Sequence, residues 1–213
     1  MKRAKAQATA KPAPSVESSI RHRIVDAAVG AFMENGYAGT STLEIATRAK
    51  VSKRDLYANF DGKQAMLVAC ITSRAARMRL PPNLPVPRSR DMLAATLVGF
   101  GATILREVSH PAVMAMFRLA IAEAERAPEV AEVLDASRVA GREALAALLA
   151  QAQSTGLLAG GDPHRMMDAF FALLWGDLLV RLLLRVADAP KPAEIDRRAR
   201  AATAAFLTLY ASA

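Results

Sequence analysis

The sequence predicts an all-α fold of about nine helices. Hydrophobic residues make up 53% of the 213-residue chain, mostly Ala and Leu, and aromatic residues only 5%. Ala and Leu lose little free energy in helices. Apolar residues recur at helical spacing, and no segment shows the alternation typical of a strand. The length suits one large domain or two small ones that share a core.

The first helix is expected to follow a basic arm. Residues 1–16 are rich in Ala, Lys, Pro and Ser without an apolar period, which predicts disorder. Apolar residues then recur on one helical face at Ile20, Ile24, Ala27, Ala28, Ala31 and Phe32. Asn35-Gly36 is predicted to end this helix.

Three helix starts follow, each with a side chain that can accept from an exposed backbone N–H and a polar partner three residues later. These pairs are Ser41 with Glu44, Ser52 with Asp55, and Asp61 with Gln64. They predict helices near 41–49, 52–58 and 61–79.

Proline residues separate these helices from the rest of the chain. Pro81, Pro82, Pro85 and Pro87 stop any helix there. Periodicity and glycine or proline punctuation then predict helices near 90–108, 111–125, 128–154, 163–187 and 192–211.

Positive charge is concentrated in the first part of the chain. Residues 1–90 contain 16 Lys/Arg and 6 Asp/Glu, whereas residues 91–213 contain 12 and 14. This asymmetry indicates a polyanion-binding module joined to a nearly neutral one. A solubilising tail is the alternative, but residues 12–90 still carry 12 positive and 6 negative charges.

The segment "LEIATRAKVSKRDLYANF", residues 43–60, predicts a helix-turn-helix motif. Leu43, Ala46 and Leu56 are expected to hold the helix pair against the first helix, with Val51 as an apolar plug between them. The second helix of such a motif can enter the major groove of DNA. A solvated basic face is the alternative interpretation.

Side chains around this motif can contact DNA in several ways. Lys53 and Arg54 can donate to phosphates or guanine edges, and Asp55 or Asn59 can discriminate bases. The Tyr57 hydroxyl can bond a phosphate, and helix starts attract anions. The candidate DNA-binding residues are Thr40, Ser41, Thr42, Lys50, Ser52, Lys53, Arg54, Asp55, Tyr57, Asn59 and Lys63.

The run "GYAGTSTLEIATRAKVSKRDLYANFDGKQAML", residues 36–67, resembles the DNA-binding region of TetR/AcrR-type bacterial transcriptional regulators. With the first helix, the resemblance covers about residues 19–68. Residues 116–186 resemble an AefR-like C-terminal domain more weakly. The implied division is a basic arm at 1–16, a helix-turn-helix domain at 17–67, and a helical ligand-binding and dimerisation domain at 68–213.

The resemblance implies a homodimer that binds a palindromic operator on double-stranded DNA, usually represses, and loosens when an unknown small effector binds. It implies phosphate contacts for Thr40, Tyr57 and Lys63. Three departures stand out. Lys50 replaces the usual turn glycine and must adopt a left-handed backbone or reshape the turn, which costs about 1 kcal/mol. Arg54-Asp55 replaces a small pair, and Gly62 and Gln64 replace the usual Ser and Glu.

Two C-terminal helices carry surplus apolar surface. The predicted helix 163–187 is apolar on nearly every side. In the predicted helix 192–211, one face carries Ile195, Ala199, Ala202, Phe206 and Leu209, with Ala205 nearby. Two such helices from each subunit can form a four-helix dimer interface. Ordinary packing within one chain is the alternative.

The remaining helices can enclose a pocket for an apolar or amphipathic ligand, because Met and Phe suit varied apolar groups. The candidate lining is Met92, Phe100, Met114, Phe117, Arg118, Met166, Phe170 and Trp175. Plain core packing is the alternative at each position.

Catalytic and metal-binding patterns are not found in the sequence. His22, His110 and His164 lack partners at metal-ligand spacing, and no phosphate loop or nucleophile elbow occurs. We therefore expect no catalytic residue, metal or cofactor. The single cysteine, Cys70, is expected to be a buried apolar residue in a reducing cytoplasm. We expect no signal peptide and no membrane span.

Two other functions stay open at this point. One is a helical small-molecule-binding protein or enzyme with an incidental basic N-terminus. The other is a non-sequence-specific DNA-packaging protein, which gives no reason for the large, nearly neutral apolar module.

Overall fold

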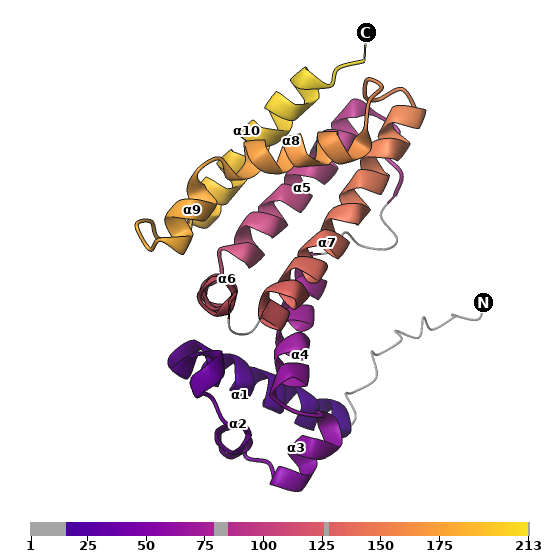
Figure 1. Ribbon diagram of the computed structural model, residues 1–213. Coiled ribbons are helices and arrows are strands. Elements are labelled where there is room, and N and C mark those ends of the chain that lie inside the picture. The colour runs from indigo at the N-terminus through magenta and orange to yellow at the C-terminus, as the bar shows by residue number, and fades with distance from the viewer. Residues whose placement is uncertain (1–15, 79–84, 126–127, 213) are drawn as a thin grey trace, which may run out of the picture.

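The computed structural model describes residues 16–78, 85–125 and 128–212 of the chain. The described residues form ten α-helices and one short 3₁₀ helix, without a strand (Figure 1). The predicted all-α fold is therefore confirmed. Most of the predicted basic arm and the start of the proline-rich segment lie outside the described residues.

The N-terminal part consists of three helices and the beginning of a fourth. These are α1 (Val16–Gly39), α2 (Thr42–Ala49), α3 (Lys53–Asn59) and α4 (Lys63–Ala75), which continues as η1 (Ala76–Met78). Helix α1 has non-helical backbone angles at Gly36, with φ 73° and ψ 172°, so the predicted break at this position is confirmed. The predicted α1 face from Ile24 to Phe32 is buried.

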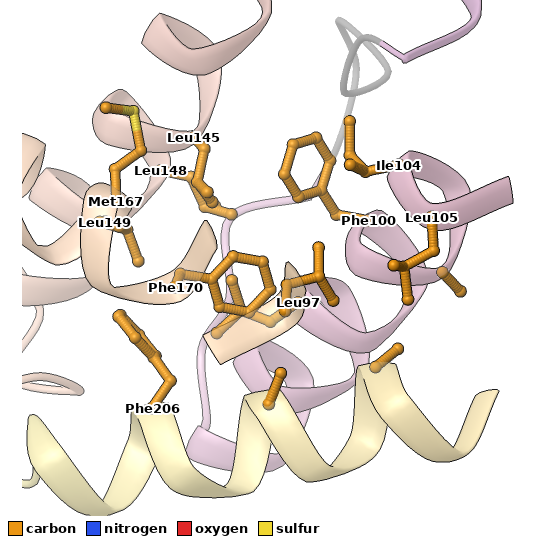
Figure 2. Packing of buried hydrophobic residues seen from close by; sticks show 14 of the residues in the cluster. Leu97, Phe100, Ile104, Leu105, Leu145, Leu148, Leu149, Met167, Phe170 and Phe206 are labelled. Atoms are coloured by element: carbon orange, nitrogen blue, oxygen red, sulfur yellow. The ribbon is translucent and has the colours of Figure 1, made fainter. Parts of the chain in front are cut away.

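The C-terminal part is built from six helices, which lie above the first three in Figure 1. Their bounds are α5 (Arg90–Val108), α6 (Pro111–Glu123), α7 (Pro128–Ser154), α8 (Pro163–Trp175), α9 (Leu178–Leu183) and α10 (Pro192–Leu209). The core of the C-terminal part lies between α5, α7, α8 and α10, where Phe100, Phe170 and Phe206 contact aliphatic side chains (Figure 2). A Cβ on Gly101 would lie 3.1 Å from Leu174 Cδ1, so this glycine lets α5 approach α8 closely.

The predicted helix at 163–187 is two helices, which raises the helix count from about nine to ten. Helix α8 ends at Gly176, whose φ of 49° and ψ of −125° do not fit a helix. A glycine adopts such angles without the steric cost of a Cβ. The sequence prediction missed this break because the apolar pattern continues across it.

The three predicted helix caps have different outcomes. Ser52 and Asp55 form a full capping box. The Ser41 side chain caps α2, but a Glu44 carboxylate oxygen accepts from Asn35 Nδ2 at 2.6 Å instead of returning to the cap. The prediction for Asp61 was wrong, because the N-cap of α4 is the next residue, Gly62, which provides no side-chain cap.

Helix α4 takes part in both halves of the molecule. Met66, Leu67, Cys70 and Ile71 are buried with residues of α1, α2 and α3. At the other end, Met78 of η1 packs against the C-terminal core. The predicted domain boundary at residues 67 and 68 falls inside this continuous helix, and the division into domains stays a prediction.

Cys70 is completely buried, which confirms its predicted role as a small apolar residue. Burial raises the pKa of its thiol to about 12. The thiolate form is therefore disfavoured at neutral pH.

No single helix in the described ranges is long and apolar enough to span a membrane. Helices α5 and α6 meet that criterion only as a pair, and they bend by 67° at their junction.

Lys50 closes α2 in the left-handed conformation, with φ 54° and ψ 48°, which is one of the two outcomes expected for a lysine in this turn. We expect Lys50→Gly to raise the free energy of unfolding by about 1 kcal/mol, because glycine has no Cβ to strain this backbone. Urea unfolding measures the change. Lys50→Ala, which removes the charge but keeps a Cβ, is the control. Equal stability of the two variants would refute the strain argument.

Candidate DNA-binding surface and ligand cavity

Helix α3 has a basic, exposed side, and Leu56 is its one buried residue. Leu56 is completely buried against α1 and α2, which contributes about 2 kcal/mol from removing its side chain from water. Lys53 and Arg54 are exposed, and Tyr57 is 47% exposed. Figure 1 shows α3 at the end of the molecule remote from the C-terminal helices, so a DNA duplex can approach this side.

Asp55 stabilises the start of α3. Its carboxylate accepts from Ser52 N at 3.3 Å and from Ser52 Oγ at 2.7 Å, while Ser52 Oγ accepts from Asp55 N at 3.0 Å. These hydrogen bonds lower the pKa of the Asp55 carboxyl group. The predicted DNA contacts of Ser52 and Asp55 stay predictions, but both side chains already have partners within the helix start.

Tyr57 and Thr42 join the two helices of the motif on its exposed side. Their hydroxyl oxygens lie 3.2 Å apart. Thr42 is the first residue of α2, so this pair sets the position of the tyrosine hydroxyl beside the start of that helix. Both hydroxyls can also bond a phosphate oxygen, because a hydroxyl donates one hydrogen bond and accepts others.

Arg21, which sequence reasoning missed, holds the far end of α3. Its Nη1 donates to the Asn59 carbonyl at 2.8 Å, and its guanidinium carbon lies 4.2 Å from the centre of the Phe60 ring. The Asn59 side-chain amide donates to the Asp55 carbonyl at 2.8 Å. Only the fold brings Arg21 here, because it lies 38 residues before Asn59 in the sequence.

A second pairing fixes α2 to α1. Arg48 donates from both terminal nitrogens to the Glu34 carboxylate, with one N–O distance of 3.0 Å. This hydrogen bonding lowers the pKa of the Glu34 carboxyl group. The spacing of 14 residues gives no helical signal, so the sequence alone did not predict the pair.

Thr40 lies in the turn between α1 and α2. Its side chain is buried, and its hydroxyl makes hydrogen bonds to the carbonyls of Gly36 at 2.7 Å and Ala31 at 3.1 Å. A hydroxyl bonded in this way stabilises the turn between α1 and α2. The predicted phosphate contact of Thr40 stays a prediction, but its hydroxyl already has partners within the protein.

The structure places Leu43 differently from the prediction. The predicted packing of Leu43 against the first helix was wrong, because its side chain is 61% exposed. Leu43 is the second residue of α2, near the Thr42–Tyr57 pair. Ala46, in contrast, is buried as predicted.

Lys63 connects the start of α4 to the turn after α1. Its Nζ donates to the carbonyls of Tyr37 at 2.6 Å and Ala38 at 3.4 Å. The same nitrogen lies 4.4 Å from the centre of the Tyr37 ring. An ammonium group has three donors, so one N–H can still reach a phosphate. Because α4 has no side-chain cap, its first backbone N–H groups can bind the same anion.

A cavity of about 190 Å³ lies in the C-terminal part. Its lining comes from the end of α4 with η1, and from α5, α6, α7, α8 and α9. A smaller cavity of about 80 Å³ shares Met78, Phe117 and Arg138 with it and reaches Arg74 of α4. The walls are mainly apolar, which is typical of a small-molecule site.

Of the eight predicted pocket residues, Phe117 and Trp175 line this cavity. Four others, Phe100, Met114, Met166 and Phe170, are buried in the C-terminal core. Met92 is 42% exposed near the start of α5. Arg118 donates to the Leu182 carbonyl at 3.1 Å and thereby ties α6 to α9. The sequence pattern could not separate core from lining, because both use the same apolar residues.

The fold and the exposed basic helix of the motif define a helix-turn-helix DNA-binding protein with a helical C-terminal domain. Comparison with known families agrees. The profile of bacterial regulatory proteins of the tetR family matches residues 24–70, and that of the AefR-like transcriptional repressor C-terminal domain matches residues 95–212. The chain belongs to the TetR family of transcriptional regulators.

Individual relatives show the same similarity. An uncharacterized HTH-type transcriptional regulator of Bacillus subtilis, YvkB, is 24% identical over 76% of this chain and 82% of its own. A TetR transcriptional regulator from Agrobacterium tumefaciens has a solved structure with a TM-score of 0.73 and 28% identity, covering 89% of this chain and 94% of its own. The flavonoid-responsive regulator FrrA has a TM-score of 0.71 and 28% identity, covering 90% and 97%.

We expect Lys63→Ala to weaken binding to all DNA sequences, lower the salt slope of binding by about one unit, and destabilise the fold. The loss of a charged donor to two carbonyls costs about 1.5–3 kcal/mol. Lys53→Ala, at an exposed position of α3, is the matched control and is expected to weaken DNA binding alone. Gel shifts at several salt concentrations and thermal unfolding measure both effects. Unchanged stability of Lys63→Ala would show that its hydrogen bonds contribute nothing.

Proposed function

We propose that this TetR-family regulator represses transcription by binding a palindromic operator as a homodimer, and that a small ligand releases it. TetR-family regulators bind operators and dimerise, and the repressor role and ligand response are typical of the family. The position of α4 is the observation that supports the proposal. This helix starts beside the candidate DNA-binding surface and ends in the wall of the cavity.

The release mechanism is a shift between two populations of the dimer. A ligand that binds only one arrangement of α4 and the cavity wall favours that arrangement. A change in the tilt of α4 moves α3 with it, because both pack in the same N-terminal core. Two α3 helices then no longer match half-sites about one turn of DNA apart.

For DNA contact we propose Lys53, Arg54 and Tyr57 on α3, with phosphates bound at the starts of α2 and α4. Ser41, Thr42 and Lys63 stand at those helix starts. Lys50 adds a charge in the turn between α2 and α3. Backbone phosphate contacts set position, and base contacts from α3 set sequence preference.

We propose that the exposed faces of α8 and α10 form the dimer interface. The predicted α10 face was partly wrong, because Ile195, Ala199, Ala202 and Phe206 are buried within the chain. The opposite side of α10 exposes small residues and Leu209, which is 64% exposed. Leu173 of α8 forms an open groove with Ala201 and Ala205. Small side chains let two helices approach closely, as a four-helix interface requires.

Selection of bound DNA from a random pool tests the proposed function. We expect a palindrome whose half-sites are separated by about one helical turn, or a multiple of it. The same experiment can include a screen for small molecules that release the protein from its operator. The similarity to a flavonoid-responsive regulator supports this addition. Enrichment of no sequence would reject the operator-binding proposal and favour non-specific packaging.

We expect Ala205→Arg to convert the dimer to a monomer and to abolish tight operator binding, because a charge would be buried in the interface. Ala205 is exposed in the single chain, so the fold should tolerate the change. Ala147→Arg, at an exposed position of α7, is the matched control. Sedimentation velocity measures the oligomeric state. A dimeric Ala205→Arg variant would exclude this part of α10 from the interface.

A further inference from the structure

We infer that the effector is an organic anion with an apolar body, and that Arg142 and Gly141 of α7 select it. This inference rests on the proposed ligand-responsive function and names the chemistry of its ligand. It follows from the wall of the cavity that α7 supplies: Ser137, Arg138, Gly141 and Arg142 all line it. Their spacing of three to four residues places them on one face of the helix.

Arg142 is a partly desolvated cation held in a defined orientation. Its guanidinium carbon lies 4.4 Å from the centre of the Phe171 ring, and Phe171 also lines the cavity. Its Nη2 pairs with Asp168. The Arg142 side chain is 19% exposed, whereas that of Asp168 is 66% exposed, so the carboxylate lies toward solvent. Stacking and pairing therefore fix the guanidinium before any ligand enters.

The donors of Arg142 are only partly used. A guanidinium has five N–H donors, and one hydrogen bond, to Asp168, is formed among the described residues. Arg138 adds a second cation at the same wall, paired with the exposed Asp135. A carboxylate or phenolate in the cavity would gain charge-assisted hydrogen bonds away from bulk water. An organic cation would meet two arginines, because the two aspartates are not part of this wall.

The remaining walls define the apolar body of the ligand. Phe117, Phe171 and Trp175 contribute aromatic side chains, and Leu179 and Ile104 contribute aliphatic ones. A flat ring system can pack between such side chains with favourable edge-to-face or offset contacts. The cavity therefore fits one charged group and an apolar ring system.

Gly141 provides space for that body. It lies in the interior of α7, where glycine costs about 1 kcal/mol relative to alanine. A Cβ added at Gly141 would meet no atom within 4 Å, so close packing does not explain this glycine. A side chain here would instead extend into the cavity. Gly141 is therefore a specificity-determining position that keeps the cavity open.

The test uses the full-length protein with 2-naphthoate and its neutral isostere 2-naphthamide as probes. Trp175 is the only tryptophan of the chain and lines the cavity, so quenching of its fluorescence reports binding there. Calorimetry gives the affinities. We expect wild type to bind naphthoate at least about tenfold more tightly than naphthamide. Arg142→Gln should remove that preference, and Arg142→Lys should restore part of it.

Gly141→Leu should abolish binding of both probes while thermal stability and operator binding remain. Gly99→Leu is the matched control, because Gly99 is an exposed glycine in α5 whose added Cβ also meets no atom within 4 Å. Three results would overturn the inference: binding of neither probe by wild type, equal affinity for both, or normal binding by Gly141→Leu. If the probes bind as expected but operator DNA is not released, the cavity chemistry stands and the proposed release mechanism fails.

Discussion

The structure depends on one helix that is buried in two places. The first half of α4 contributes Met66, Leu67 and Cys70 to the N-terminal core, and its extension η1 packs against the C-terminal core through Met78. Protein interiors are close-packed, so neither end of α4 can move without its neighbours. A change in the cavity wall and a change in the position of α3 are therefore mechanically linked.

The N-terminal core is itself completed by the larger part of the molecule. Met116 and Ala120 of α6, with Val130 of α7, are buried in the same cluster as α1 and α4. Hydrophobic burial is non-directional, but it requires surfaces that match in shape. Helices α1 and α4 thus pack against α6 and α7, and α6 and α7 also line the cavity. Only α4 belongs to both the candidate DNA-binding surface and the cavity wall, and α6 and α7 connect the cavity wall to the N-terminal core directly.

The two proposed binding surfaces, α3 and the cavity, use charge in different ways. On α3, Lys53 and Arg54 are exposed, so their attraction for a polyanion acts from a distance and is screened by salt. In the cavity, Arg142 is mostly shielded from water and acts only on a ligand in contact with it. Long-range attraction suits a search along DNA, whereas short-range hydrogen bonding suits discrimination between small molecules.

Sequence periodicity predicted most helices because the apolar face of a helix follows from the spacing of apolar residues within that segment. The buried face of α1 and the capping box of α3 were both predicted from local patterns. The break at Gly176 was not, since leucines continue on both sides of it. Local signals predict where a helix starts more reliably than where an apolar run bends.

The sequence by itself determined the helical class, the helix-turn-helix motif, the basic charge of the N-terminal part and the family. Only the tertiary structure decided which polar and apolar residues face a partner. The Thr40 side chain is buried, the Leu43 side chain is exposed, and Gly141 lines a cavity. The reason is physical: helix formation depends on neighbours a few residues away, whereas burial and pairing depend on segments that are distant along the chain and meet only after folding.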